Sequence, residues 1–509
     1  MKRILLLLLI VTAGTVLYAQ LPEAVFAEDV SMMRHRPKVG HIAERTPRKV
    51  STQRRSVGDL NLAPRGLLIL AEFADVHFLP ENPAAAFDSL VNSADYTYNG
   101  ATGSTREYYR AQSNGQYVPD FDVVGPVVLP HEMAFYGAND SEGYDCNTGD
   151  FMMDAVAAAD ALGVDFTLYD NDQDGYIDFV YVIYAGFGEA DTHILNTIWP
   201  HNWDMMSNFY YGYTTQSTYY YRNANDFRLP QYDGLYLNDY ACSPCLRSTG
   251  ERAGIGTFSH EFGHVLGLPD YYPAVGNANY GQVRSYSPGS WSIMGYACYT
   301  NLGRTPCNYS VYDKYFLGWL TPSVPEHNRS YTLSTDYDDV YLVTRDGQMP
   351  AAGARTVDTI YYLENRQYDG WDTYLPGHGL LIWRVVYDPD AWYNNTPNDT
   401  YLIGYTLLTA SGRQPYTTYI YGADREDVPF PGTDSVTTVT LFNRFVLSDI
   451  AEIDGQVSFH FADLTQTMPT DCPSPALASH TVRKQLRNGQ FVIQKQGREY
   501  DLLGRPLKY

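Results

Sequence analysis

Long apolar runs are almost absent from this 509-residue sequence, and none after the N-terminus approaches the roughly 20 residues that a membrane-spanning helix needs. The one strong run, Ile4 to Val11, follows Lys2 and Arg3 and precedes the small residue Ala19. This order is typical of a secretory signal peptide. We therefore expect residues 1–19 to be a signal peptide cleaved after Ala19, and the protein to be secreted or held at the cell surface without a membrane span.

Basic residues are scarce in the body of the chain. The sequence has 35 Lys and Arg against 58 Asp and Glu, a net charge of −23. Residues 1–64 and 481–509 each carry a net charge of +5, so residues 65–480 carry −33. A body this acidic would repel nucleic acid and anionic membranes. We expect protein or peptide substrates, no nucleic-acid partner, and a monomer.

Cysteine is also scarce, with six residues in the chain. An even number in an exported protein favours disulfide bonds. We expect a disulfide between Cys298 and Cys307 because they lie close in sequence. Cys242 and Cys245 have the spacing of half a zinc knuckle, but no second pair has that spacing, so disulfide chemistry is the better prediction. The remaining two are Cys146 and Cys472.

The segment His260-Glu261-Phe262-Gly263-His264 carries the strongest chemical pattern. Apolar residues recur at helical spacing from Ala253 to Gly267, and residues four apart lie on one face of a helix. The imidazoles of His260 and His264 can therefore converge on one zinc ion, with Glu261 beside them. Asp270 is the candidate third ligand, because no glutamate follows Glu261 before Glu326 to serve instead.

Two histidines, one carboxylate and an open fourth position are typical of a catalytic zinc site. Such an ion lowers the pKa of water to about 7, and Glu261 could act as general base while the water attacks a peptide carbonyl. The pattern predicts a zinc endopeptidase. Two rivals stay open: a calcium-stabilised adhesin or binding protein with a vestigial zinc site, and an amidase acting on a non-protein amide. The simplest alternative is a surface helix with two solvated histidines.

A second metal pattern precedes a predicted strand. Its carboxylates alternate with other residues and can converge on a hard cation such as calcium, to which the carbonyl of Tyr176 adds an oxygen. Position 12 of the loop is Tyr181, not the glutamate of an EF-hand, so we expect a structural calcium loop that leads into a strand. An unliganded acidic turn is the alternative. The carboxylates are Asp170, Asp172, Asp174 and Asp178.

The pattern of elements predicts an α/β catalytic domain over residues 65–325 and a β-rich, sandwich-like domain over residues 326–465. Gly66 to Phe73 and Phe179 to Tyr184 are apolar runs typical of buried strands, and Asp150 to Leu162 is typical of a helix. Strand, helix, strand and active-site helix favour α/β. Alternating runs at Thr359 to Glu364 and Gln456 to Phe461 favour the sandwich.

The flanking segments predict processing and export. Residues 20–64 are basic, lack periodicity and contain Arg54-Arg55, which favours a propeptide that docks on the acidic body; a passive leader is the alternative. This segment has no cysteine, so inhibition would need a carboxylate or occlusion of the cleft. Residues 466–480 favour a linker, and Asn488-Gly489 favours a hairpin within the tail, residues 481–509.

Several segments together are more distinctive than any single motif. They are GLLILAEFADV (66–76), STREYYRAQSNGQY (104–117), DNDQDGYIDFVYVIYAGFGEA (170–190), GTFSHEFGHVLGLPDYY (256–272), NLGRTPCNYSVYDKYFLGWLTP (301–322), YYLENRQYDGWDTYLPGHGLLIW (361–383) and FPGT (430–433). The chain from about residue 66 to 461 resembles the immune inhibitor A-like secreted metallopeptidases, a metzincin-related family of bacterial zinc proteases. The resemblance implies a metzincin-like catalytic domain in a secreted endopeptidase. It places zinc on His260, His264 and Asp270, makes Glu261 the base, and puts calcium at the Asp170 loop.

Other positions extend this resemblance or depart from it. Met294, thirty residues after His264, is similar to the methionine turn beneath the metal of metzincins, and Tyr296 or Tyr299 could supply a hydroxyl to the oxyanion. The sequence does not distinguish between these two tyrosines. Cys245 and Cys307 stand where the family has a carboxylate and a proline, and Arg384 stands where it often has histidine. The tail is similar to type IX sorting segments of Bacteroidetes; a plain terminal hairpin is the alternative.

Overall fold

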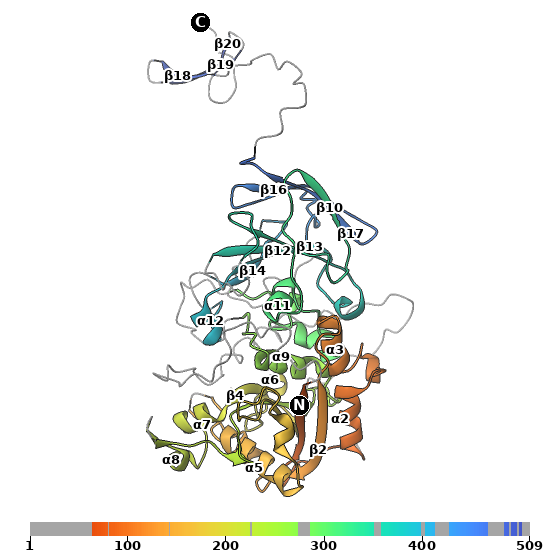
Figure 1. Cartoon of the computed structure of the whole chain (residues 1–509), viewed down its shortest axis with the longest axis vertical. Helices are drawn as coiled ribbons and strands as arrows, with labels where there is room; N and C mark the ends of the chain where they lie inside the picture. Colours follow the sequence, from red (N-terminus) through yellow and green to blue (C-terminus); the bar gives the residue numbers. More distant parts are fainter. Residues whose placement is uncertain are drawn as a thin grey trace, which may run out of the picture. The chain divides into compact units, whose positions relative to one another are not determined.

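The computed structural model describes residues 64–79, 81–141, 143–223, 226–272, 286–350, 358–398, 403–412 and 427–466, and the backbone of 483–487, 490–495 and 498–500. The chain divides into two compact units, Met1–Ala462 and Asp463–Tyr509 (Figure 1). The expected signal peptide, nearly all of the expected propeptide, and Cys472 lie outside the described residues. Among the described residues, no helix is long and apolar enough to cross a membrane.

A five-stranded mixed sheet forms the centre of the first part of unit one. Its order is β2 (Asp120–Val128), β1 (Arg65–Glu72), β3 (Val180–Phe187), β9 (Asp239–Leu246) and β4 (His201–Asp204). The first four strands run parallel, and β4 pairs antiparallel with β9 at the edge. The predicted strands at Gly66 to Phe73 and Phe179 to Tyr184 are confirmed as β1 and β3.

Helices cover both faces of this sheet. Successive side chains of a strand point to opposite faces, and in β1 both sets are apolar, so both faces must be covered. Leu68 and Leu70 of β1 share a core with α9 (Ile255–Val265), whereas Leu67 and Ile69 share a separate core with α5 (Thr148–Ala161). The expected helices, Asp150 to Leu162 and Ala253 to Gly267, are confirmed as these two. Strands that are buried on both faces read as continuous apolar runs.

The remaining elements of this part are short. They are α2 (Pro83–Asn92), η2 (Tyr98–Gly100), α3 (Thr105–Gln112), α4 (Met133–Tyr136), η3 (Phe166–Tyr169), α6 (Glu189–Thr192), α7 (Met205–Tyr211), α8 (Ser217–Tyr220), β5 (Tyr221–Asn223), β6 (Asp226–Phe227), β7 (Gln231–Tyr232), β8 (Leu235–Tyr236), η4 (Gly289–Trp291), η5 (Ala297–Tyr299), α10 (Thr300–Gly303) and α11 (Val311–Phe316).

Two four-stranded sheets make up the β-rich region of the same unit. One has the order β10 (Arg329–Leu333), β17 (Gln456–Asp463), β16 (Phe445–Ile453), β15 (Val439–Leu441), and the other has β11 (Tyr341–Thr344), β12 (Thr359–Arg366), β13 (Gly379–Val386), β14 (Tyr405–Leu407). The short helices η6 (Gly370–Asp372) and α12 (Pro389–Tyr393) complete it.

The second of these sheets is buried on both faces. Leu363 and Ile382 lie in the core between the two sheets, while the adjacent residues Tyr362 and Trp383 lie in the same core as α9. The α/β part and the β-rich region therefore share one hydrophobic core. The structure is mixed α/β with a β-rich C-terminal part, as the sequence predicts.

The second unit contains a small antiparallel sheet of β18 (Arg483–Arg487), β19 (Gln490–Lys495) and β20 (Arg498–Tyr500). Arg487 pairs with Gln490, so the hairpin predicted around Asn488-Gly489 is confirmed. Its similarity to a sorting segment stays a prediction.

The disulfide predictions are wrong for the described cysteines, all five of which are free thiols. Cys242 and Cys245 lie three apart on β9 and point into different cores, so their sulfurs face away from each other. The Sγ of Cys307 contacts the carbonyl oxygen of Asn308 at 3.3 Å, and that of Cys298 the carbonyl oxygen of Gly295 at 4.0 Å. Burial raises the pKa of these thiols, and that of Cys245 to about 12, which keeps them protonated.

Candidate metal centre

Helix α9 carries the two histidines and aims them away from the sheet. Its apolar residues Phe258 and Phe262 pack on the sheet, where the Phe262 ring lies 4.5 Å from that of Phe179. The helix ends at Val265. Two residues later Gly267 has the left-handed φ of +98°, and the amide of Leu268 donates to the carbonyl of Gly263. This turn, predicted from Gly267, brings Asp270 back to the helix.

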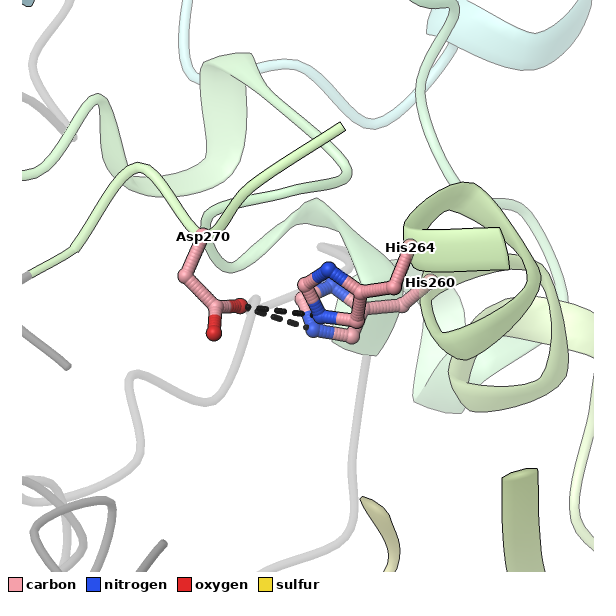
Figure 2. A group of neighbouring side chains, drawn as sticks. All are labelled: His260, His264 and Asp270. Atoms are coloured by element: carbon pink, nitrogen blue, oxygen red, sulfur yellow. Dashed lines mark ion pairs between the residues drawn. The ribbon is translucent and has the colours of Figure 1, made fainter. Parts of the chain in front are cut away.

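Three ligand atoms meet at this turn (Figure 2). The Oδ1 of Asp270 lies 3.2 Å from Nε2 of His260 and 3.3 Å from Nε2 of His264. The three residues each offer one ligand atom, all within 4.8 Å of one another. Asp270 is fully buried and the two histidine side chains are nearly so. The three residues expected to hold the metal are thus brought together.

Backbone carbonyls orient both imidazole rings. The Nδ1 of His260 lies 2.7 Å from the carbonyl oxygen of Ile293, and the Nδ1 of His264 lies 2.8 Å from that of Leu268. A carbonyl can only accept, so each Nδ1 donates its proton there, and in the neutral imidazole this leaves the Nε2 lone pair for a metal ion. Two neutral imidazole nitrogens and one carboxylate oxygen with fixed orientation are a donor set that fits zinc.

A residue of the β-rich region fixes Asp270 through two hydrogen bonds. Asn395, 125 residues further along the chain, accepts a hydrogen bond from the Asp270 amide and donates one to Asp270 Oδ2, both at 2.6 Å. Sequence reasoning missed this residue, because no local pattern links Asn395 to the zinc motif.

Glu261 lies beside a small cavity at the metal centre. The cavity has a volume of about 20 Å³, enough for about one water molecule, and Glu261, His260 and Tyr299 line it. Tyr296 is not among the lining residues and instead packs near Tyr272. Burial raises the pKa of Tyr299 well above its usual value, so its hydroxyl stays protonated. Of the two tyrosines that the sequence leaves open, Tyr299 is the one that lines the cavity.

A segment after β3 forms another wall of this cavity through Ala190, Trp199 and Pro200. Its position is fixed by two buried carboxylates that the sequence did not single out. Asp145 accepts from the Trp199 amide at 2.8 Å, and Glu189 accepts from the Asn139 side chain at 3.0 and 3.1 Å. Burial raises the pKa of both carboxyl groups.

Met294 lies directly beneath α9. A Cβ atom added to Gly263 would lie 2.6 Å from the Met294 sulfur, and the Met294 carbonyl accepts from the Tyr271 amide at 2.8 Å. The methionine therefore contacts both the zinc motif and the segment that carries Asp270, as a methionine turn would.

The acidic loop before β3 brings only part of its predicted ligands together. Asp170, Asp172 and Asp178 each offer a carboxylate oxygen within 4.8 Å of the others. Asp174 instead accepts a hydrogen bond from the Tyr176 amide at 3.0 Å, and its own amide donates to Asp170. A calcium ion at this loop stays a prediction.

Comparison with known proteins agrees with this geometry. Residues 84–320 match the family model for the immune inhibitor A peptidase M6 catalytic domain. The chain is 27% identical over 318 residues to immune inhibitor A of Bacillus thuringiensis subsp. alesti, covering 55% of this chain and 43% of the relative. It is 26% identical over 250 residues to the pre-pro-metalloprotease PrtV of two Vibrio cholerae serotype O1 strains, covering 44% of this chain and 25% of the relative.

The buried histidine and carboxylate group lies within the segment that matches a metallopeptidase catalytic domain. Residues 84–320, just under half of the chain, are similar to the catalytic domain of the immune inhibitor A peptidases. The chain spans less than half the length of the curated relatives it matches.

Proposed function

We propose that this protein is a secreted, zinc-dependent endopeptidase with a metzincin-like catalytic domain. The observation that carries the proposal is the convergence of Asp270 Oδ1 with the Nε2 atoms of His260 and His264, whose Nδ1 atoms are already bonded to carbonyls. Zinc bound there would supply Lewis acidity, which polarises a substrate carbonyl and lowers the pKa of water.

Glu261 is the proposed general base. Its carboxylate lies beside a cavity with room for about one water, between the metal ligand His260 and Tyr299. In this position Glu261 takes the proton of the attacking water and returns it to the leaving amine. The Tyr299 hydroxyl donates a hydrogen bond to the oxygen of the attacked carbonyl, where negative charge develops.

Export, a propeptide and calcium at the Asp170 loop belong to the same proposal. The apolar run at Ile4 to Val11 supports export, and the similarity to a pre-pro-metalloprotease supports a propeptide. The converging carboxylates of Asp170, Asp172 and Asp178 support the calcium site.

Digestion of casein by protein that starts near Arg65 tests the proposal. We expect cleavage that a zinc chelator removes and added zinc restores. Glu261→Gln should still bind zinc, because all three ligands remain, but should cleave about 10²–10⁴-fold more slowly because the proton acceptor is lost. Zinc content measured on both proteins is the control.

Two results would contradict the proposal. Absence of chelator-sensitive cleavage across several unfolded protein substrates would favour a binding protein with a vestigial site. Full activity in Glu261→Gln would remove Glu261 as the base.

A further inference from the structure

We propose that Asn395 is a positioning residue for the third metal ligand, so that the β-rich region sets how tightly the centre holds zinc. This inference rests on the proposed function, since it takes Asp270 as a metal ligand. It concerns a residue outside the segment that matches the catalytic-domain family model, which ends at residue 320.

The geometry of the contact is the first argument. One side-chain amide makes two hydrogen bonds to one residue: Oδ1 of Asn395 accepts from the backbone amide of Asp270, and Nδ2 donates to Oδ2, both at 2.6 Å. This pair fixes the backbone and the carboxylate of Asp270 together. The other carboxylate oxygen, Oδ1, is then directed at the two imidazoles.

Asn395 is itself held in place. It follows α12, whose first turn is capped by the Asp388 side chain, and its amide donates to the carbonyl of Trp392. Its backbone has a φ of +57°, a left-handed conformation that asparagine tolerates better than most residues. Trp392 is buried in the shared core, which fixes α12 against the catalytic part. These contacts fix the backbone of Asn395 and so the position from which its side-chain amide reaches Asp270.

A second contact from the same loop fixes the next residue. The buried Asn398 donates to the carbonyl of Tyr271 at 2.8 Å and also bonds the backbone of Tyr405. The rings of Tyr271 and Tyr405 stack with centroids 3.7 Å apart and planes within 7°. The β-rich region thus contacts both residue 270 and residue 271.

These contacts act on metal affinity because an oriented ligand does not have to be ordered when the ion binds. Loss of a hydrogen-bond partner of a metal ligand typically costs 10- to 100-fold in affinity. The three candidate ligands lie on helix α9 and its following turn. The orientation of Asp270 nevertheless depends on Asn395, which lies 75 residues beyond residue 320, where the family match ends.

Zinc affinity of the full chain, measured by competition with a chromophoric chelator, tests the inference. Asn395→Gly removes the amide and keeps the left-handed backbone, which glycine adopts without steric cost. Asn328→Gly is the matched control, because Asn328 has the same φ of +57° at the start of β10. Asn395→Asp, which keeps the size and one acceptor but cannot donate to Asp270, covers the case in which the glycine variant fails to fold.

We expect zinc to bind about 10- to 100-fold more weakly to both Asn395 variants and with unchanged affinity to Asn328→Gly. The visible spectrum of cobalt bound in place of zinc should also change in the Asn395 variants, because it reports ligand geometry rather than stability. If both Asn395 variants had the same zinc affinity and the same cobalt spectrum as the unmutated protein, this inference would be wrong, but the proposed function would still stand. Failure of the unmutated protein to bind zinc would overturn the proposed function as well.

Discussion

At the scale of single residues, Asp313 gives a pH-dependent test of the shared core. Asp313 is buried and accepts hydrogen bonds from the Tyr271 hydroxyl at 2.7 Å and from Ser310. The pKa of Asp313 is raised to about 6, mainly by burial and also by the charge of Glu364, while the hydrogen bonds from Tyr271 and Ser310 act in the opposite direction. Tyr271 adjoins Asp270, so this carboxyl group lies just behind the metal centre.

The sign of the effect follows from the raised pKa. Between about pH 4 and pH 6 the folded protein binds the Asp313 proton more tightly than the unfolded chain, so this stabilisation is present at low pH and is lost as the pH rises through 6. We expect the free energy of unfolding of the unmutated protein, relative to Asp313→Asn, to fall by about 2 kcal/mol between pH 4.5 and 7.5. Urea unfolding at several pH values measures it. A difference that does not vary with pH would contradict the burial argument.

The residues of the candidate metal centre were predictable to the extent that they are local. His260, Glu261, His264 and Asp270 lie within eleven positions of one helix and one turn, so helical periodicity and Gly267 suffice to bring them together. Asn395 could not be found in this way, because its contact to Asp270 depends on how two distant regions pack. The disulfide expectation failed for a related reason: closeness in sequence does not fix the direction of a side chain.

At the scale of elements, the position of α9 depends on a close backbone contact. A Cβ atom at Gly256 would lie 1.8 Å from the carbonyl oxygen of Cys298, in the segment that also lines the cavity beside Glu261. Backbone atoms on that segment cannot move aside as the end of a flexible side chain could. Glycine at this position therefore allows α9 to approach the segment that follows Met294.

We expect Gly256→Ala to lower the free energy of unfolding by about 1–3 kcal/mol, the usual cost of overpacking. Helix propensity alone predicts the opposite sign, because alanine stabilises a helix interior by about 1 kcal/mol over glycine. The sign of the change in unfolding free energy, measured by denaturant unfolding with the metal removed, shows whether overpacking or helix propensity dominates. An increase in stability would show that α9 does not sit as close to Cys298 as the structure describes.

The acidic loop before β3 gives a second prediction at this scale. Calcium at 100 times its dissociation constant should raise the free energy of unfolding by about 2.7 kcal/mol. Asp172→Ala removes one of the three converging carboxylates and should abolish this rise, whereas Asp160→Ala, on an exposed part of α5, should not. Thermal unfolding with and without calcium is the measurement. A melting temperature of the unmutated protein that ignores calcium would remove this loop from the metal sites.

Long elements were easier to predict than short ones. The buried strands β1 and β3 and the helices α5 and α9 each show a continuous or periodic apolar pattern. The edge strand β4, four residues long and mostly half-buried, shows no such pattern, and its antiparallel pairing with β9 depends on tertiary contacts. The same limit applies to the three-residue strands β14 and β15.

At the scale of the whole molecule, the β-rich region is part of the metal centre's support rather than an independent attachment. Trp383 and Tyr405 of its second sheet share a core with Phe262 of α9, and described residues up to Ala462 form one compact unit. The sequence predicted a β-rich region after the α/β part, but not the shared core, because a strand buried on both faces has the same apolar pattern whichever neighbours cover it. The exact domain boundaries stay predictions.

Charge distribution gives a prediction about latency. Residues 20–64 carry eight Lys and Arg against five Asp and Glu and precede a strongly acidic body. We expect protein over residues 20–509 with Arg54 and Arg55 changed to Ala to cleave casein more slowly than protein starting near Arg65. Salt should reduce the difference, because the screening length falls from about 10 Å at 0.1 M to about 3 Å at 1 M. Equal activity of the two forms at low salt would identify the segment as a passive leader.

The most direct test of the central claim is X-ray diffraction at the zinc absorption edge from crystals of the zinc-loaded protein. The account predicts a strong anomalous peak about 2.0–2.1 Å from Nε2 of His260 and of His264 and about 2.0–2.2 Å from a carboxylate oxygen of Asp270. Zinc held by other residues, with none at this group, would contradict it.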